Sequence, residues 1–215
     1  SLLEGNPVHE DMTEACAMLE PDFLLNTVFT PDGAVSEIVA GHWYKAWEKG
    51  CQDLLKMAGV KIKELADVVI ASAGGYPKDL NLYQSIKCHM NATFAVKKGG
   101  IMIFTLDCED IKEPAIFTDC FSRSNLEQFE KDIREAFTVP AFVAFKGRNI
   151  LSDVTAYLVT RPENFDFVKR TGHIPCSTLE EAWSLAQAKL AKQGKHDYTI
   201  TIMGHGSATL PILEQ

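Results

Sequence analysis

The chain has 215 residues, of which 46% are hydrophobic and 23% are charged, an ordinary composition for a globular protein with a sizeable core. Its formal net charge of −8 argues against a nucleic-acid partner, which needs a broad basic face, but is compatible with a small anion held by one or two cations. No apolar run reaches the roughly 20 residues that span a bilayer, and no signal peptide is visible, so we expect no membrane partner. The six cysteines are scattered without a CxxC pair, which predicts reduced thiols and a cytoplasmic location.

The first part of the chain predicts two helices and a β-hairpin. Helical patterns cover residues 10–19 and 42–59. Between them, residues 23–41 contain two apolar runs joined by a Pro-Asp-Gly turn, which is typical of a hairpin. Residues 60–67 are expected to form a connector.

Beyond residue 66, strands and helices alternate. Strands are predicted over 67–73, 100–106, 154–160 and 198–203, and helices over 79–98, 125–137, 141–152 and 177–193. Short apolar strands separated by helices predict an α/β fold, a mostly parallel sheet with helices on both faces in a Rossmann-like three-layer arrangement. Ligands of such sheets bind beyond the carboxyl ends of the strands. The segments expected there are 72–79, 106–110, 160–164 and 204–211, of which the first and last are rich in glycine.

The segment SAGGYPKDLNLYQSIK, residues 72–87, joins a predicted strand to a predicted helix. Gly74 and Gly75 permit a close approach of the backbone to a ligand. Asp79 is the expected N-cap, and the helix is expected to stop at Gly99 and Gly100, after two lysines in its last turn.

A helical projection separates two faces of this helix. The core-facing side is expected to carry Leu82, Ile86, Met90 and Thr93, and the opposite side Gln84, Lys87 and Asn91, with Tyr83 at the boundary. The residues alone leave two interpretations open. One is a capped surface helix with solvated polar groups, and the other is an anion held by loop amides, the helix N-terminus and Lys87. The loop is neither GxGxxG nor GxxxxGK[ST], so it does not indicate a nucleotide.

The stretch ASAGGYPKDLNLYQSIK closely resembles a segment of the nickel-dependent lactate racemase family. The stretches LLEGNPVHEDM, GHWYKAWEKGC and GHGSATLPIL resemble other parts of the same family, so the resemblance covers essentially the whole chain. It implies that residues 1–62 are the end of the family's N-terminal, nickel-binding catalytic domain, and that residues 63–215 are its complete C-terminal α/β domain.

The resemblance also implies a function. The family is an isomerase family that interconverts the enantiomers of lactate or related 2-hydroxy acids, by hydride transfer to and from a nickel pincer nucleotide derived from nicotinic acid. Its acid/base histidines, cofactor-tethering lysine and nickel ligand lie in the N-terminal domain and have no counterpart here. No catalytic or metal-binding residue is therefore assigned to this chain, and the fragment alone is expected to be inactive. Its implied partners are a small 2-hydroxy acid and the N-terminal domain of the same protein.

Three residues match family positions that face the shared cleft and contact cofactor or substrate. Gln84 and Lys87 are the main candidates, and Tyr83 is a weaker one. Ile86 departs from the family, in which a polar residue is frequent, but it is expected to face the core. An amine and a carboxamide on one helix face can orient a carboxylate or a phosphate.

Other candidate residues are interpreted as structural or solvated. Ser207 in GHGSATLP does not fit the GxSxG nucleophile pattern, so this stretch is interpreted as a glycine-bent loop, and a secondary role in the cleft stays open for His205. Cys88 and His89 point to different sides of a helix and build no metal site. The histidines at 9, 42, 173 and 196 are interpreted as isolated, and the acidic residues at 107, 109 and 110 as solvated. The alternative function is a self-contained, non-catalytic α/β module that binds an anion or nucleotide.

Overall fold

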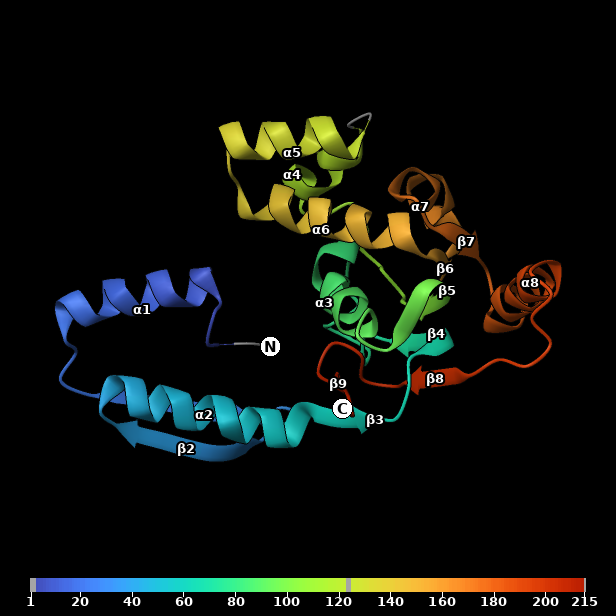
Figure 1. Cartoon of the computed structure of the whole chain (residues 1–215). Helices are drawn as coiled ribbons and strands as arrows, with labels where there is room; N and C mark the ends of the chain where they lie inside the picture. Colours follow the sequence, from blue (N-terminus) through green and yellow to red (C-terminus); the bar gives the residue numbers. More distant parts are fainter. Residues whose placement is uncertain (1–2, 123–124, 215) are drawn as a thin grey trace. The chain divides into compact units, whose positions relative to one another are not determined.

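The structure is a computed structural model that describes residues 3–122 and 125–214. It divides into two compact units, residues 1–59 and 60–215. The first unit contains α1 (Pro7–Leu19), β1 (Leu24–Phe29), β2 (Val35–Gly41) and α2 (Trp43–Ala58), as Figure 1 shows. β1 and β2 form the predicted antiparallel hairpin, and α2 packs against it. The two helices and the hairpin that the sequence predicts for this unit are therefore confirmed.

The second unit is built on a five-stranded parallel sheet. The strand order is β7 (Ile174–Cys176), β6 (Thr155–Val159), β5 (Val96–Thr105), β4 (Ala66–Ser72) and β8 (Ile200–Met203). All four neighbouring pairs are parallel, which confirms the predicted sheet. A separate two-stranded pair, β3 (Gly59–Ile62) with β9 (Leu210–Leu213), was not predicted.

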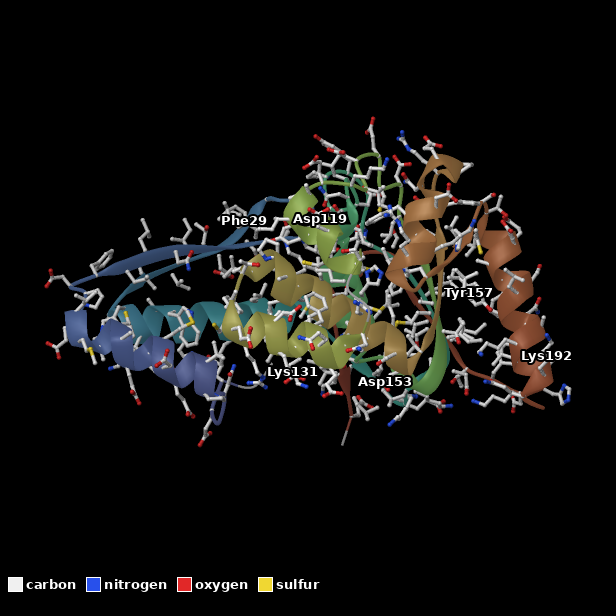
Figure 2. The ribbon with its side chains drawn as sticks, turned by 90° about the horizontal axis from the view of Figure 1, so that it is seen from above. Phe29, Asp119, Lys131, Asp153, Tyr157 and Lys192 are labelled. Atoms are coloured by element: carbon white, nitrogen blue, oxygen red, sulfur yellow. The ribbon has the colours of Figure 1, made fainter. Side chains whose placement is uncertain are left out.

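Helices cover both faces of this sheet. One face carries α3 (Leu82–Ala92), α6 (Val139–Asp153) and α7 (Phe165–Thr171), and the other carries α8 (Leu179–Lys192) (Figure 1). Two short helices, α4 (Ala115–Thr118) and α5 (Leu126–Glu135), lie on the α6 side, and the 3₁₀ turns are η1 (Asp119–Ser122) and η2 (Pro162–Asn164). Two apolar clusters result, one containing Phe104 and the other containing Tyr157, which lies on the α8 side of the sheet (Figure 2). The predicted three-layer α/β arrangement is thus confirmed.

The order of the strands reverses between β4 and β8. From β4 the chain adds β5, β6 and β7 in one direction, with the connecting helices on one face. It then returns through α8 on the opposite face and places β8 on the free side of β4. The loops that leave the carboxyl ends of β4 and β8, residues 73–81 and 204–209, therefore flank the topological switch point of the sheet.

The predicted helix over 79–98 is wrong at both ends. The N-cap is Asn81, whose side-chain oxygen accepts a hydrogen bond from Gln84 N at 2.9 Å, and Asp79 lies in the preceding turn. At the other end, Val96 is already part of β5, where it pairs with Ala66 of β4. Gly99, with φ +74°, and Gly100 lie inside β5 and are not a helix cap. Strand pairing therefore overrides a local pattern that is typical of a helix end.

Three predicted helices are confirmed as α5, α6 and α8, with ends that differ by one or two residues. At the start of α8, Thr178 Oγ1 accepts from Glu181 N at 3.2 Å, and the Glu181 carboxylate accepts from Ser177 N, one residue before the N-cap, at 2.7 Å, an arrangement close to a capping box. α4, α7 and β7 were not predicted. All six cysteines are free thiols. No helix within residues 3–122 and 125–214 is long and apolar enough to cross a bilayer.

Candidate functional site

The loop after β4 is shaped by its two glycines. Gly74 and Gly75 have φ values of +103° and +77°, a region that residues with a Cβ rarely adopt. Gly74 N donates to Ser72 Oγ at 3.2 Å, and Lys78 N donates to Gly75 O at 2.8 Å. The loop therefore turns the chain sharply from the sheet edge into α3, as the sequence predicts.

The polar face of α3 contains the sequence-predicted candidates. Lys87 is exposed and Gln84 is half-buried, and Lys87 Nζ donates to Gln84 Oε1 at 3.4 Å. Asn91 lies on the same side, where its Nδ2 donates to Gly206 O at 2.8 Å. The structure thus brings Gln84 and Lys87 together and uses Asn91 to hold the loop that follows β8.

The core face of α3 differs from its prediction. Leu82 and Ile86 are buried as expected, but Met90 is 38% exposed. Ser85 and His89 are fully buried, and the Ser85 hydroxyl donates to Asn81 O at 2.9 Å. The projection missed both residues because they are polar, although their spacing places them in line with Leu82 and Ile86.

The Tyr83 side chain is half-buried at the boundary between these faces. Its ring packs edge-on against Phe117, with the ring centroids 5.4 Å apart. This contact orients Tyr83 partly toward the core, so the residue contributes less to the open polar face than Gln84 and Lys87.

His89 of α3 and His173 form a buried pair that the sequence did not predict. His89 Nε2 lies 2.9 Å from His173 Nε2, and the His89 ring stacks on Phe104 with centroids 3.8 Å apart. The outer nitrogens are bound too, because His89 Nδ1 lies 3.0 Å from Ser85 O and His173 Nδ1 lies 2.8 Å from Thr171 Oγ1. The interpretation of His173 as isolated is therefore wrong, since strand order brings together residues that lie far apart in the sequence.

The hydrogen bonds of this pair assign its protons. The Ser85 carbonyl only accepts, so His89 Nδ1 carries a hydrogen, and Nε2 of a neutral His89 must accept from His173 Nε2. Burial lowers the pKa of His89 to about 4 and, together with the neighbouring ring, holds the pKa of His173 well below its ordinary value. Both rings are therefore neutral at pH 7 and serve to connect α3 to the segment before β7.

The loops after β5 and β6 meet in a second polar group at the sheet edge. The Asp107 carboxylate accepts from Arg161 Nε at 2.7 Å and from Arg161 Nη2 at 2.6 Å. This bidentate bond lowers the pKa of Asp107 and raises that of Arg161. Asp107 is half-exposed and paired, in contrast to the simple solvated carboxylate that we expected.

The residue types that bind metals do not cluster within residues 3–122 and 125–214. Within the part of the chain that the structure describes, no group of three or more His, Cys, Asp or Glu side chains is placed to hold a metal ion. The groups that could contact a ligand near α3 are instead an amine, a carboxamide and glycine-loop amides, which suit a carboxylate or a phosphate.

Comparisons with known proteins agree with one another. Residues 61–210 match the family model described as the lactate racemase C-terminal domain. The chain is 32% identical over 199 residues to a lactate racemase of Thermoanaerobacterium thermosaccharolyticum, which covers 90% of this chain and 46% of that relative. It is 31% identical over 108 residues to a lactate racemase of Lactiplantibacillus plantarum, which covers 50% of this chain and 25% of that relative.

Solved structures show the same relationship. The lactate racemase apoprotein of T. thermosaccharolyticum superposes with a TM-score of 0.87 at 29% identity, over 98% of this chain and 51% of that one. A protein of Thermotoga maritima superposes with a TM-score of 0.64 at 15% identity, over 97% and 54% of the two chains, which shows the fold alone. The chain spans about half the length of the first of these relatives.

Proposed function

This chain belongs to the lactate racemase family through its C-terminal domain, and we propose that it is the C-terminal part of a 2-hydroxy-acid racemase or epimerase. In this proposal residues 1–62 end the N-terminal domain and residues 63–215 form the C-terminal domain. The N-terminal domain of the same protein is the partner, and the free thiols of the chain favour a cytoplasmic location. The observation that carries the proposal is the outward-facing pair of Gln84 and Lys87 on α3, the helix that follows the carboxyl end of β4.

The two side chains suit the chemistry of a 2-hydroxy acid. The Lys87 ammonium can donate charge-assisted hydrogen bonds to a carboxylate, which is the part of the substrate that does not change during racemisation. Gln84 accepts from Lys87 through its amide oxygen, which leaves its NH₂ group to donate to a second oxygen of the ligand. Together they would orient the substrate, and a correctly positioned substrate is a large part of a catalysed reaction.

The family's nickel pincer nucleotide would supply the hydride acceptor when it is bound. The described residues offer an amine and a carboxamide that fit a phosphate or a carboxylate, and they offer no three-ligand group for nickel. We therefore assign to this chain the binding and orientation of anionic groups, and to the N-terminal domain the nickel ligand and the acid/base histidines. The chain alone is expected to be inactive.

The first prediction tests Lys87 in the full-length enzyme. The Lys87→Ala variant is expected to fold normally and to lose about 10- to 150-fold in kcat/KM, because a hydrogen bond from a charged group is worth about 1.5–3 kcal/mol. Lys87→Arg keeps the charge but changes the geometry, so an intermediate loss is expected. The matched control is Lys98→Ala, an exposed lysine on β5, which should racemise at the wild-type rate. Wild-type turnover in Lys87→Ala would contradict the proposed function.

A further inference from the structure

The loop that follows β8 is held firmly against β4 and α3. Gly206 N donates to Ser72 O at 2.7 Å, and Gly206 O accepts from Asn91 Nδ2 at 2.8 Å, so both backbone polar groups of Gly206 are bound. A Cβ at this position would lie 2.5 Å from Cys88 Sγ and 3.0 Å from Ser72 O. Glycine is therefore required here, and the loop cannot shift without breaking two hydrogen bonds.

This attachment places His205 over the glycine loop that follows β4. A Cβ built on Gly74 would lie 3.0 Å from His205 Nδ1 and 3.7 Å from Lys78 Cδ. Gly74 thus leaves room for the imidazole, and the Lys78 side chain approaches the same point. His205 is exposed as a residue although its backbone is held by the loop, so its ring is both positioned and accessible. Two side chains that can carry positive charge therefore converge on one backbone position.

Ser207, the next residue but one, has an unexplained hydroxyl. Its Oγ is buried and has no hydrogen-bond partner, and it is the single side-chain nitrogen or oxygen atom of this kind within residues 3–122 and 125–214. A buried hydroxyl without a partner destabilises a fold unless a water molecule satisfies it. Because this oxygen is buried, it is not placed to contact a ligand over the exposed His205.

The position of these residues in the fold is the one at which open α/β sheets bind ligands. His205 and Ser207 follow β8 and Gly74 follows β4, so both loops leave the carboxyl edge at the topological switch point. Asp79, the acidic residue of the glycine loop, accepts through Oδ2 from Asp107 N at 3.5 Å. The His205 imidazole and the Lys78 amine can both donate hydrogen bonds to an anionic oxygen group.

We propose that the loop of residues 204–207 binds an oxyanion through His205, with the neighbouring Lys78 side chain as a further contact. This site is additional to Gln84 and Lys87 on α3. The ligand is a carboxylate or a phosphate. This inference rests on the proposed function only in naming the source of that group, which is a hydroxy-acid substrate for the carboxylate and a cofactor for the phosphate. The site itself depends on no catalytic activity.

The test is direct binding to the 215-residue chain, followed by NMR of the histidine rings. Lactate and inorganic phosphate are titrated separately at one fixed pH. We expect the ring signals of His205 to shift saturably with at least one of the two, lactate identifying a carboxylate site and phosphate a phosphate site. The internal control is His196, an exposed histidine before β8 at the other end of that strand. The inference is overturned if His205 responds to neither anion, or if His196 shifts equally.

Two variants sharpen the result. His205→Gln, which removes the imidazole and keeps a polar side chain, is expected to weaken binding about three- to tenfold, whereas His196→Gln leaves it unchanged. Gly74→Ala should weaken binding similarly by displacing the imidazole, although it leaves His205 itself in place. Wild-type affinity in His205→Gln would also overturn the inference, whatever the stability of Gly74→Ala. The two proposals can fail separately. If Lys87→Ala loses turnover but the His205 signals respond to neither anion, this inference alone is contradicted. If the His205 signals shift but Lys87→Ala keeps wild-type turnover, the proposed function alone is contradicted.

Discussion

The buried histidine pair shows how single residues set the behaviour of α3. His89 and His173 are joined through their Nε2 atoms in a site that excludes water, so adding a proton to either ring places a charge in the core. Among the residues that the structure describes, no charged side chain accepts a hydrogen bond from either ring, since their outer partners are the Ser85 carbonyl and the Thr171 hydroxyl. Protonation is therefore expected to favour the unfolded chain.

The second prediction is a pH dependence of stability from this pair. Because the pKa of His89 is lowered from about 6.5 in the unfolded chain to about 4 in the fold, the unfolded state binds more protons between these values. The stabilisation is thus complete above about pH 6.5 and is lost as the pH falls toward 4, by roughly 3 kcal/mol for His89. Urea unfolding at a series of pH values measures this slope.

Matched variants separate this effect from general acid unfolding. The double variant His89→Gln, His173→Gln should lose most of the slope between pH 6.5 and pH 5, a range in which most carboxylates stay ionised. His196→Gln removes an exposed histidine and should leave the slope unchanged. A wild-type free energy of unfolding that is flat across this range would contradict the prediction.

Residue-level reasoning from sequence worked where polarity and exposure agree. The projection of α3 placed Gln84 and Lys87 on the outward face, and the structure confirms that orientation. The projection failed for His89, because an imidazole is buried without a large energetic cost only when its ring nitrogens have hydrogen-bond partners. That partner, His173, arrives through tertiary structure, and no local pattern in the sequence indicates it.

At the scale of elements, Asp67 ties three parts of the sheet together. This residue of β4 is buried, and its carboxylate accepts from Lys97 of β5 at 2.8 Å and from Lys195, which precedes β8, at 2.6 Å. Thr199 N donates to the same carboxylate at 3.1 Å. The pKa of Asp67 lies far below its ordinary value. The hydrogen bond from Lys195 makes the largest contribution to this lowering, and the bond from Lys97 makes the next largest. Its stabilisation is therefore present above about pH 3.9 and is lost as the pH falls below that value.

The third prediction concerns the two lysines of this cluster. Lys97→Met and Lys195→Met should each cost less than about 1 kcal/mol, because the lysines are 40% and 44% exposed and each leaves Asp67 with one cation. The double variant should cost about 2 kcal/mol more than the sum, since it leaves a buried carboxylate unpaired. Adding Asp67→Asn should recover most of that excess. Additive losses in urea unfolding would show that the cluster is not coupled.

The same cluster explains why sequence reasoning misplaced the end of α3. From the sequence, Lys97 is expected to be a cation in the last turn of a helix. In the structure its ammonium donates to the Asp67 carboxylate on the neighbouring strand β4. The helix ends at Ala92 because the following residues complete β5, and pairing of Val96 with Ala66 is a contact between distant segments. The existence of strands and helices was predictable from periodicity, whereas their ends depended on partners that the sequence order does not reveal.

At the scale of the whole chain, the two units differ in how much core each contains. Both buried apolar clusters lie within the second unit. Among the described residues of the first unit, the buried apolar side chains are Val28, Val39 and Ala46. The outer face of its hairpin exposes Leu25 and Ile38 by 67% and 65%, and Phe29 projects from the end of β1 (Figure 2). Such an exposed apolar face is typical of an interaction surface, which supports the proposed N-terminal domain as its partner.

The fourth prediction follows from this difference in core content. A protein of residues 59–215, which keeps β3 for its pairing with β9, is expected to unfold cooperatively with a midpoint within a few degrees of that of the same unit in the 215-residue chain. Residues 3–58 alone are expected to show no cooperative transition, because a single hairpin and two helices bury too little apolar surface. Thermal unfolding followed by circular dichroism measures both. The prediction is contradicted if residues 59–215 unfold without cooperativity, and equally if residues 3–58 alone show a cooperative transition.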